Sequence, residues 1–246
     1  MKILSGNKIK LIACISMFVD HLAIVYLLLS MVVAFDADTF DGMRIIGRVA
    51  FPLYCFLLVE GFVHTKNRMK YLISILITAF ISQIPFSLLF NPKFFEISGV
   101  SVPTLNVCFT LGIGLITLMC IEKVKKPEDN ENYLNHMLYY GLNLLIIILS
   151  CTVTYILDTD YSYTGIILIV ILYYLRKTDI ICLITGFVVF SALIDNLWVL
   201  PSFVIMYMYN GKRGKNIGKF KYLFYAFYPL HMAFLYLLLR LGLRYN

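Results

Sequence analysis

Nine apolar segments, joined by short polar stretches, run through this chain almost from end to end. A helix needs roughly 20 residues to cross a hydrocarbon core of about 30 Å, and most of the segments are close to that length. With 61% of its residues hydrophobic and 14% charged, the chain has too little polar surface to cover a water-soluble fold. The sequence therefore predicts an all-α, polytopic transmembrane helical bundle of about nine helices, in a single domain that covers residues 1–246. The predicted spans are residues 9–34, 44–64, 70–90, 105–121, 134–156, 162–175, 180–194, 197–209 and 222–240.

Three of these segments, at residues 162–175, 180–194 and 197–209, are short for a complete crossing, so tilted, re-entrant or buried helices are expected there. The first segment follows three lysines, as the apolar part of a secretory signal peptide would. However, its apolar run from Ile9 to Phe35 is longer than that part of a signal peptide and lacks an obvious small-x-small cleavage site. A first spanning helix is therefore the preferred interpretation.

Basic and acidic residues alternate between the predicted spans. Most of the 21 Lys and Arg residues fall in five clusters, at residues 2–10, 66–70, 123–126, 176–177 and 212–221, and nine crossings place all five on one side. The opposite side has few cations and carries Asp36, Asp38, Asp41, Glu96, Asp158, Asp160 and Asp195. Because basic loops stay cytoplasmic, the pattern predicts a multi-pass protein of the cell (plasma or inner) membrane with a cytoplasmic N-terminus. The net charge of +7 then reflects topology, and no nucleic-acid partner is predicted.

Several ionisable residues lie at membrane depth, where each one costs enough free energy to mark a candidate site. They are Asp20 and His21 in the first span, Arg44, Arg48, Glu60 and His64 in or beside the second, and His231 in the ninth. These groups could simply pair with one another to hold the bundle together, but their number favours a polar cavity. Neighbouring helix residues point about 100° apart, so Asp20 is expected to meet an Arg from another helix instead of His21.

Metal binding is not predicted. The chain has His and carboxylate residues, but no HExxH or comparable ligand spacing. The six cysteines all fall inside apolar segments and form no CxxC pair, which is typical of small buried side chains.

The spacing of Lys10 and His21 suggests a ligand. Eleven residues are close to three helical turns, so both side chains share one helix face, about 16 Å apart along the axis. A cation at the cytoplasmic mouth could hold the phosphates of an anionic ligand while a histidine deep in the membrane meets its reactive end. An acyl-CoA has about that reach. The alternative is that Lys10 only sets the topology and extends to the interface.

Longer residue strings resemble a known family. Lys10-Leu-Ile-Ala through Met17-Phe-Val-Asp20-His21, Arg44-Ile-Ile-Gly47-Arg48-Val-Ala-Phe51-Pro52 and Glu60-Gly61-Phe-Val-His64-Thr65 are similar to the TraX family. So are Lys70-Tyr71, Leu105-Asn106-Val-Cys-Phe-Thr110, Asp160-Tyr161 with Gly165, and Phe224-Tyr225-Ala-Phe-Tyr228-Pro229-Leu230-His231. The resemblance implies a membrane-embedded acetyltransferase, because TraX is held responsible for N-acetylating pilin. The basic-x10-His spacing also resembles the acyltransferase-3 family, which acylates cell-envelope glycans. Ser162 stands where the TraX family is expected to favour Gly.

This resemblance leads to a hypothetical mechanism. Acetyl-CoA is the donor substrate, and its phosphates are expected to meet Lys10 and the cations Lys66, Arg68 or Lys70. His21 is the candidate general base, with His231 as the rival base or second proton carrier. Arg48 or Asn106 would stabilise the oxyanion, while Asp20, Glu60 and His64 orient these groups or line the cavity. Transfer through an acetylated His stays open. The expected partners are acetyl-CoA, membrane lipid and a peptide, pilin-like or glycan acceptor.

Two other classes of function stay open. Buried Asp, Glu, His and Arg also occur in proton-coupled transporters of small molecules. Against that class, the chain shows no repeated halves and no pair of broken helices. The third class is a non-catalytic membrane assembly factor, in which the histidines would be dispensable.

Overall fold

The structure is a computed structural model that describes residues 2–30, 35–90, 104–128, 132–176, 179–215, 218 and 222–244. Helices dominate these residues, which contain isolated β-bridges but no β-strand. The helices are α1 (Gly6–Leu28), α2 (Ala37–Gly47), α3 (Ala50–His64), α4 (Arg68–Phe90), α5 (Val107–Lys123), α6 (Tyr133–Ile156), α7 (Ser162–Tyr174), α8 (Asp179–Leu193), the 3-10 helix η1 (Leu197–Val199), α9 (Leu200–Tyr207) and α10 (Leu223–Arg244).

The predicted all-α class is confirmed, and each predicted span coincides with helix. The second predicted span, residues 44–64, overlaps the end of α2 and all of α3, and the two helices together form a nearly continuous helical stretch over Ala37–His64. Among the described residues, five helical stretches are long and apolar enough to cross a membrane: α1, α2 with α3, α4, α6 and α10. The predicted orientation stays a prediction. Residues 31–34 of the first span, and the charged residues Glu96, Lys177, Lys219 and Lys221, lie outside the described residues.

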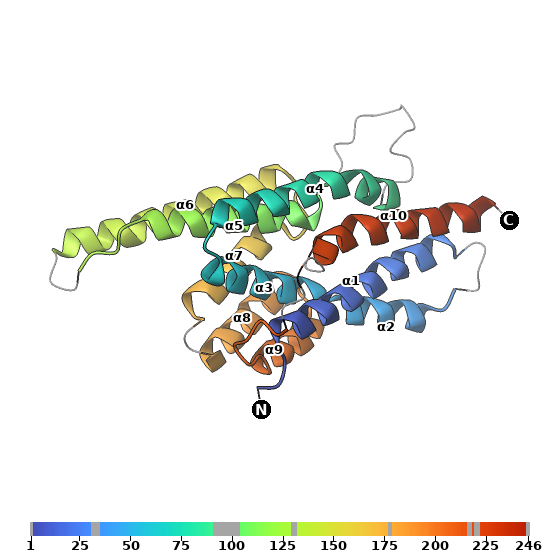
Figure 1. Cartoon of the computed structure of the whole chain (residues 1–246), viewed down its shortest axis with the longest axis horizontal. Coiled ribbons are helices and arrows are strands. Elements are labelled where there is room, and N and C mark those ends of the chain that lie inside the picture. Colours follow the sequence, from blue (N-terminus) through green and yellow to red (C-terminus); the bar gives the residue numbers. More distant parts are fainter. Residues whose placement is uncertain are drawn as a thin grey trace.

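Helix α3 occupies the centre of the bundle, in contact with α1, α5, α7 and α9 (Figure 1). Its sequence is apolar on all sides, which is typical of a helix enclosed by others. Around it, α10 packs against α1 and α4, and α5 packs between α4, α6 and α7. Helix α6 lies at the edge, and one of its ends extends past the neighbouring helices (Figure 1).

Two short backbone pairings tie polar loops to helix ends. Leu4 pairs with Tyr209, which brings the segment after α9 to the start of α1. There the backbone N–H groups of Gly6 and Asn7, which lack partners within the helix, donate to the carbonyls of Lys212 and Arg213 at 2.9 and 3.0 Å. Leu105 pairs with Thr159, which holds the α6–α7 loop against the start of α5. The first pairing positions Arg213 and the second positions Asp160, and each of these residues lines one of the cavities described below.

Candidate functional site

Two cavities lie within the bundle and share part of their walls. The first, called here the ionic cavity, has a volume of about 670 Å³, and its wall includes Asp20, His21, Arg44, Arg48, Asp160 and Tyr161. The second, called here the apolar cavity, has a volume of about 420 Å³ and a mostly apolar wall. Apart from tyrosines and a cysteine, the ionisable residues in that wall are Lys10, Glu60, His64 and Arg213. Met17, Tyr54 and Val107 line both cavities, so the two lie back to back.

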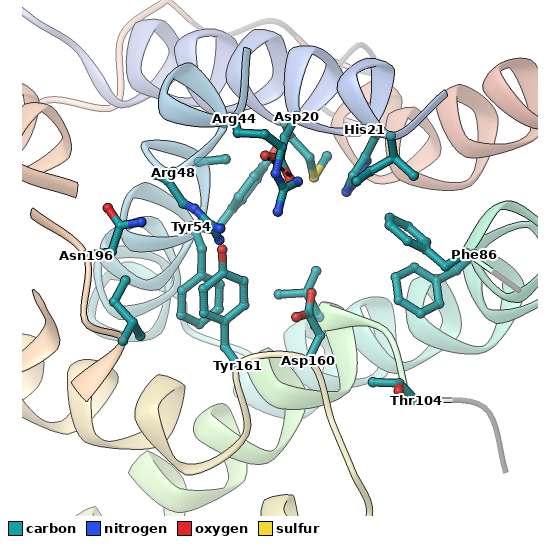
Figure 2. A pocket seen from close by; sticks show the side chains of 18 of the residues that line it. Asp20, His21, Arg44, Arg48, Tyr54, Phe86, Thr104, Asp160, Tyr161 and Asn196 are labelled. Carbon is teal, nitrogen blue, oxygen red and sulfur yellow. Dashed lines mark ion pairs between the residues drawn. The ribbon is translucent and has the colours of Figure 1, made fainter. Parts of the chain in front are cut away.

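An ion pair between α1 and α2 forms one wall of the ionic cavity. Arg44 Nη1 lies 2.8 Å from Asp20 Oδ1, which confirms the prediction that Asp20 meets an Arg from another helix. The close approach depends on Gly47, because a Cβ atom built there would overlap Oδ1 and Cβ of Asp20. Figure 2 shows both charged groups at the edge of the same open space.

The α6–α7 loop supplies the opposite wall (Figure 2). Tyr161 has a left-handed backbone, with φ of 60°, and its ring stacks on Phe51 at 3.7 Å between centroids. Arg48 donates a hydrogen bond to the Tyr161 hydroxyl, and Thr110 holds the loop by donating to the carbonyl of Asp160. These contacts fix the Asp160 side chain at the cavity.

Asp160 and Arg48 bring opposite charges to the cavity without forming an ion pair with any residue that the structure describes. Burial and, to a lesser extent, the negative charge of Asp20 raise the pKa of the Asp160 carboxyl to about 6, although the hydrogen bond from the Tyr161 N–H partly offsets them. The ionic cavity therefore contains one paired carboxylate, Asp20, and one unpaired carboxyl group, Asp160.

The two membrane histidines form a hydrogen-bonded pair between α1 and α10. His21 Nδ1 lies 2.8 Å from His231 Nε2, and the rings stack with centroids 5.1 Å apart. His231 Nδ1 lies 2.8 Å from the carbonyl oxygen of Phe227, and the His231 side chain is buried. His21 lines the ionic cavity, whereas His231 lies behind it.

These contacts determine where the protons lie. A carbonyl oxygen can only accept, so His231 Nδ1 carries hydrogen and donates to Phe227. In the neutral ring His231 Nε2 is then an acceptor, and it must receive its hydrogen bond from His21 Nδ1. His21 Nε2 is consequently left with a lone pair, as a general base requires. The arrangement makes His231 the positioning residue of this pair.

The apolar cavity has its charged residues on α1, α3 and the segment that follows α9. Lys10 lies over the Phe224 ring, 5.7 Å from its centroid, and Arg213 is held at the start of α1 by the backbone contacts described above. The His64 Nδ1–H donates to the carbonyl of Glu60 at 2.9 Å. Lys10 and His21 both lie on α1, but Lys10 lines the apolar cavity and His21 lines the ionic cavity.

Four other predicted residues lie away from both cavities. Lys66 and Lys70 are exposed, and Arg68 pairs with Glu122 while its guanidinium lies 4.4 Å from the centroid of Phe62. Asn106 is buried.

The Asn106 side chain has a structural role at the start of α5. The Asn106 amide donates to the carbonyl of Ala79 and to Gln83 Oε1, both at 2.8 Å, while its oxygen accepts from the N–H of Cys108. Both amide hydrogens are thus in use in this structure.

Two residues of these cavities are not predicted by the sequence pattern. The pattern places Arg213 only among the basic residues that set the topology, although it faces the apolar cavity. Tyr54, on the shared wall, donates to Cys14 Sγ at 3.3 Å, and no sequence pattern distinguished it from the other aromatic residues. Within the part of the chain that the structure describes, no three His, Cys, Asp or Glu side chains gather as a metal site requires.

Comparison with known proteins decides the family. A family model described as TraX protein matches residues 5–239, which is nearly the whole chain. The chain belongs to the TraX family. A relative from Dichelobacter nodosus, described as a probable fimbrial assembly protein FimC of serogroup H1, is 30% identical, and the match covers 94% of each chain. No solved structure matches the chain.

Two of the strings that carry the TraX resemblance contribute several residues each to the cavity walls. Gly47, Arg48 and Phe51 line the ionic cavity. The string from Glu60 to Thr65 contributes Glu60, Gly61, His64 and Thr65 to the apolar cavity. The TraX resemblance and the cavity geometry, reached by separate routes, thus identify the same region of the bundle.

Proposed function

We propose that this TraX-family chain is a membrane-embedded acetyltransferase, which moves an acetyl group from acetyl-CoA to an amine or hydroxyl acceptor. The observation that carries the proposal is the histidine pair. His231, fixed by the Phe227 carbonyl, leaves His21 Nε2 with a lone pair at the wall of a polar cavity. A neutral histidine held in one tautomer is suited to accept a proton from an attacking acceptor.

The donor is assigned to the apolar cavity. Lys10 and Arg213 supply two cations for the phosphates of CoA, and the apolar wall suits a pantetheine arm with its thioester toward Met17 and Tyr54. Lys10 and His21 are about 16 Å apart along α1, a distance that an extended pantetheine arm can cover. Arg213 replaces Lys66, Arg68 and Lys70 as the partner of Lys10, because those three do not line the cavity.

The acceptor is assigned to the ionic cavity. As its nitrogen or oxygen attacks the thioester carbonyl, His21 Nε2 takes the acceptor proton. The bond between the carbonyl carbon and sulfur then breaks, and the CoA thiolate recovers that proton from His21. Arg48, a cation without an ion-pair partner among the described residues, is the candidate for stabilising the oxyanion. Tyr54 stands between the two cavities and would position the thioester.

A second candidate function is a non-catalytic role in fimbrial assembly. It is favoured by the description of the Dichelobacter nodosus relative as a probable fimbrial assembly protein. Both candidates place the chain in the cell membrane, and an acetyltransferase that modifies a pilus subunit would itself contribute to assembly. A proton-coupled transporter is the remaining alternative, since two adjoining cavities with charged walls could also form a path.

Acetyl transfer from radiolabelled acetyl-CoA tests the proposal. Membranes carrying the wild type, His21→Ala or no protein would be given peptides with a free N-terminus, and separately glycans, while CoA release is followed. Label on an acceptor with the wild type alone supports the enzyme. CoA release and labelling equal to those of empty membranes would overturn it in favour of assembly. Counterflow of a small molecule in liposomes, without consumption of acetyl groups, would favour the transporter.

A further inference from the structure

A third cavity lies far from the histidine pair, where the chain passes from α5 to α6. Its volume is about 510 Å³, and Lys123, Lys125 and Lys126 line it together with apolar residues of α6. We propose that this lysine pocket binds the headgroup of an anionic glycerophospholipid. The proposal goes beyond the proposed function and does not depend on it.

Charge is the first argument. The three lysines follow one another within four positions, and none of them pairs with a carboxylate of the described residues. The nearest acidic residue before them, Glu122, is taken by Arg68. Three ammonium groups around one cavity, with no ion-pair partner in the described part of the chain, suit a phosphodiester. Basic pockets beside transmembrane helices on the cytoplasmic side are typical sites for anionic headgroups.

The floor of the pocket is the second argument, because it is apolar. Leu138 and Leu142 form part of it, and both are about half exposed. Leu145 and Leu149 continue from them along α6 at the same exposure. The spacing of four, three and four residues places these leucines on one helix face. A stripe for acyl chains thus leads away from the lysines.

The position of α6 is the third argument. This helix is apolar enough to cross a membrane, yet only 11% of the residues in its most apolar 18-residue segment are buried against the rest of the protein. Its first turns carry exposed Tyr133 and Tyr140, and amphipathic rings of this kind gather at membrane interfaces. In Figure 1 the extended segment after α5 runs beside those turns, past the ends of the neighbouring helices. Lysines, aromatic rings and an apolar stripe therefore follow in the order in which a phospholipid presents its parts.

A free phosphate or phosphorylated small molecule would use the lysines but not the stripe. The two sources can be separated by comparing full lipids with headgroup fragments. The proposal of a lipid site requires that the chain binds phosphatidylglycerol and has little affinity for glycerol phosphate at the same concentration.

The test uses the full chain in nanodiscs of phosphatidylcholine that contain 0 or roughly 20% phosphatidylglycerol, and native mass spectrometry of bound lipid in mild detergent. The variant is Lys123→Gln/Lys125→Gln/Lys126→Gln. The matched control is Lys8→Gln/Lys66→Gln/Lys70→Gln, which removes three exposed cations from the side predicted to be the same and leaves the third cavity intact.

Phosphatidylglycerol should bind the wild type and the control alike and bind the pocket variant about tenfold or more weakly, while phosphatidylcholine binds all three equally. A melting temperature of the pocket variant equal to that of the wild type in pure phosphatidylcholine shows that it is folded. As a second variant, Lys123→Arg/Lys125→Arg/Lys126→Arg, which keeps the charge, should retain the lipid. Equal binding of phosphatidylglycerol by wild type and Gln variant, or displacement of the lipid by glycerol phosphate or inorganic phosphate, would overturn the proposal.

Discussion

Two pairs of ionisable side chains that the sequence places at membrane depth lie in different surroundings. His21 and His231 come from two helices and lie 2.8 Å apart, with the second ring fixed by a backbone carbonyl. Glu60 and His64 come from one helix, the His64 side chain is 66% exposed, and its Nδ1 lies 3.8 Å from the nearest Glu60 carboxylate oxygen. In the first pair the Phe227 carbonyl sets the proton positions on both rings, because the two rings are hydrogen-bonded to each other. In the second pair the Glu60 carbonyl sets only the His64 ring, and the Glu60 carboxylate lies beyond hydrogen-bond distance of that ring.

Removing one histidine from each pair gives the largest expected contrast. His21→Ala should lower acetyl transfer about a hundredfold or more, since a positioned general base contributes 10²–10⁴-fold. His64→Ala should change it little, because that ring is mostly exposed and does not line the ionic cavity, to which the acceptor is assigned. Initial rates of radiolabel transfer, normalised to the amount of protein in the membrane, measure both. Loss of transfer in His64→Ala with retention in His21→Ala would reverse the assignment.

The double substitution distinguishes a positioning role of His231 from that of a rival base. If His231 acts only through His21, then His231→Ala should reduce transfer, and His21→Ala/His231→Ala should be no slower than His21→Ala alone. Two independent bases would instead give losses that multiply. The readout is the coupling between the two substitutions, which a merely structural role of His231 would leave near zero.

Two glycines of α2 test the ion pair that borders the ionic cavity. Gly47→Ala should destabilise the protein by about 1–3 kcal/mol, because the new methyl group would overlap Asp20 and displace it from Arg44. Gly42→Ala is the control, since nothing lies within 4 Å of its position, and it should stabilise the helix by about 0.5–1 kcal/mol. Thermal unfolding in detergent measures both. Equal melting temperatures for the two variants would show that the contact at Gly47 is not required.

The cations of the apolar cavity are expected to have a smaller effect, confined to donor affinity. Arg213→Gln and Lys10→Gln should each raise the KM for acetyl-CoA about fivefold, as the loss of one partly exposed charge contact of about 1 kcal/mol implies, with kcat nearly unchanged. Lys70→Gln, which removes an exposed cation outside the cavity, should not raise KM. A KM for Lys70→Gln as high as that for Arg213→Gln would instead support the first prediction, in which Lys66, Arg68 or Lys70 binds the phosphates of acetyl-CoA.

Much of this architecture can be predicted from the sequence, for identifiable reasons. Apolar length fixed the position of nearly every helix, and the 100° step between Asp20 and His21 was enough to predict an Arg partner for Asp20. Arg213 and Tyr54 could not be predicted, because their roles depend on which segments meet in space.

The role of Asn106 was hidden for a different reason. An amide side chain near the start of a helix can cap the helix or face a cavity. Only the hydrogen bonds that Asn106 forms with Gln83 and Cys108 show that it is a cap. The sequence shows which residues lie at membrane depth, but not which of them are already paired.

The two carboxyl groups of the ionic cavity extend the comparison to pH. Asp20 has an ion pair and Asp160 has none, and burial raises the pKa of Asp160 from 3.8 to about 6. Between these values the folded chain holds a proton at Asp160 that the unfolded chain has lost, so the contribution of Asp160 to stability falls as the pH rises from about 4 to 6.

Asp160→Asn cannot ionise, so its melting temperature relative to the wild type should rise across that interval and level off above it. Asp38→Asn, at the exposed start of α2, is the control and should follow the wild type. Parallel curves for Asp160→Asn and the wild type would mean that Asp160 titrates in the folded protein as it does in the unfolded chain.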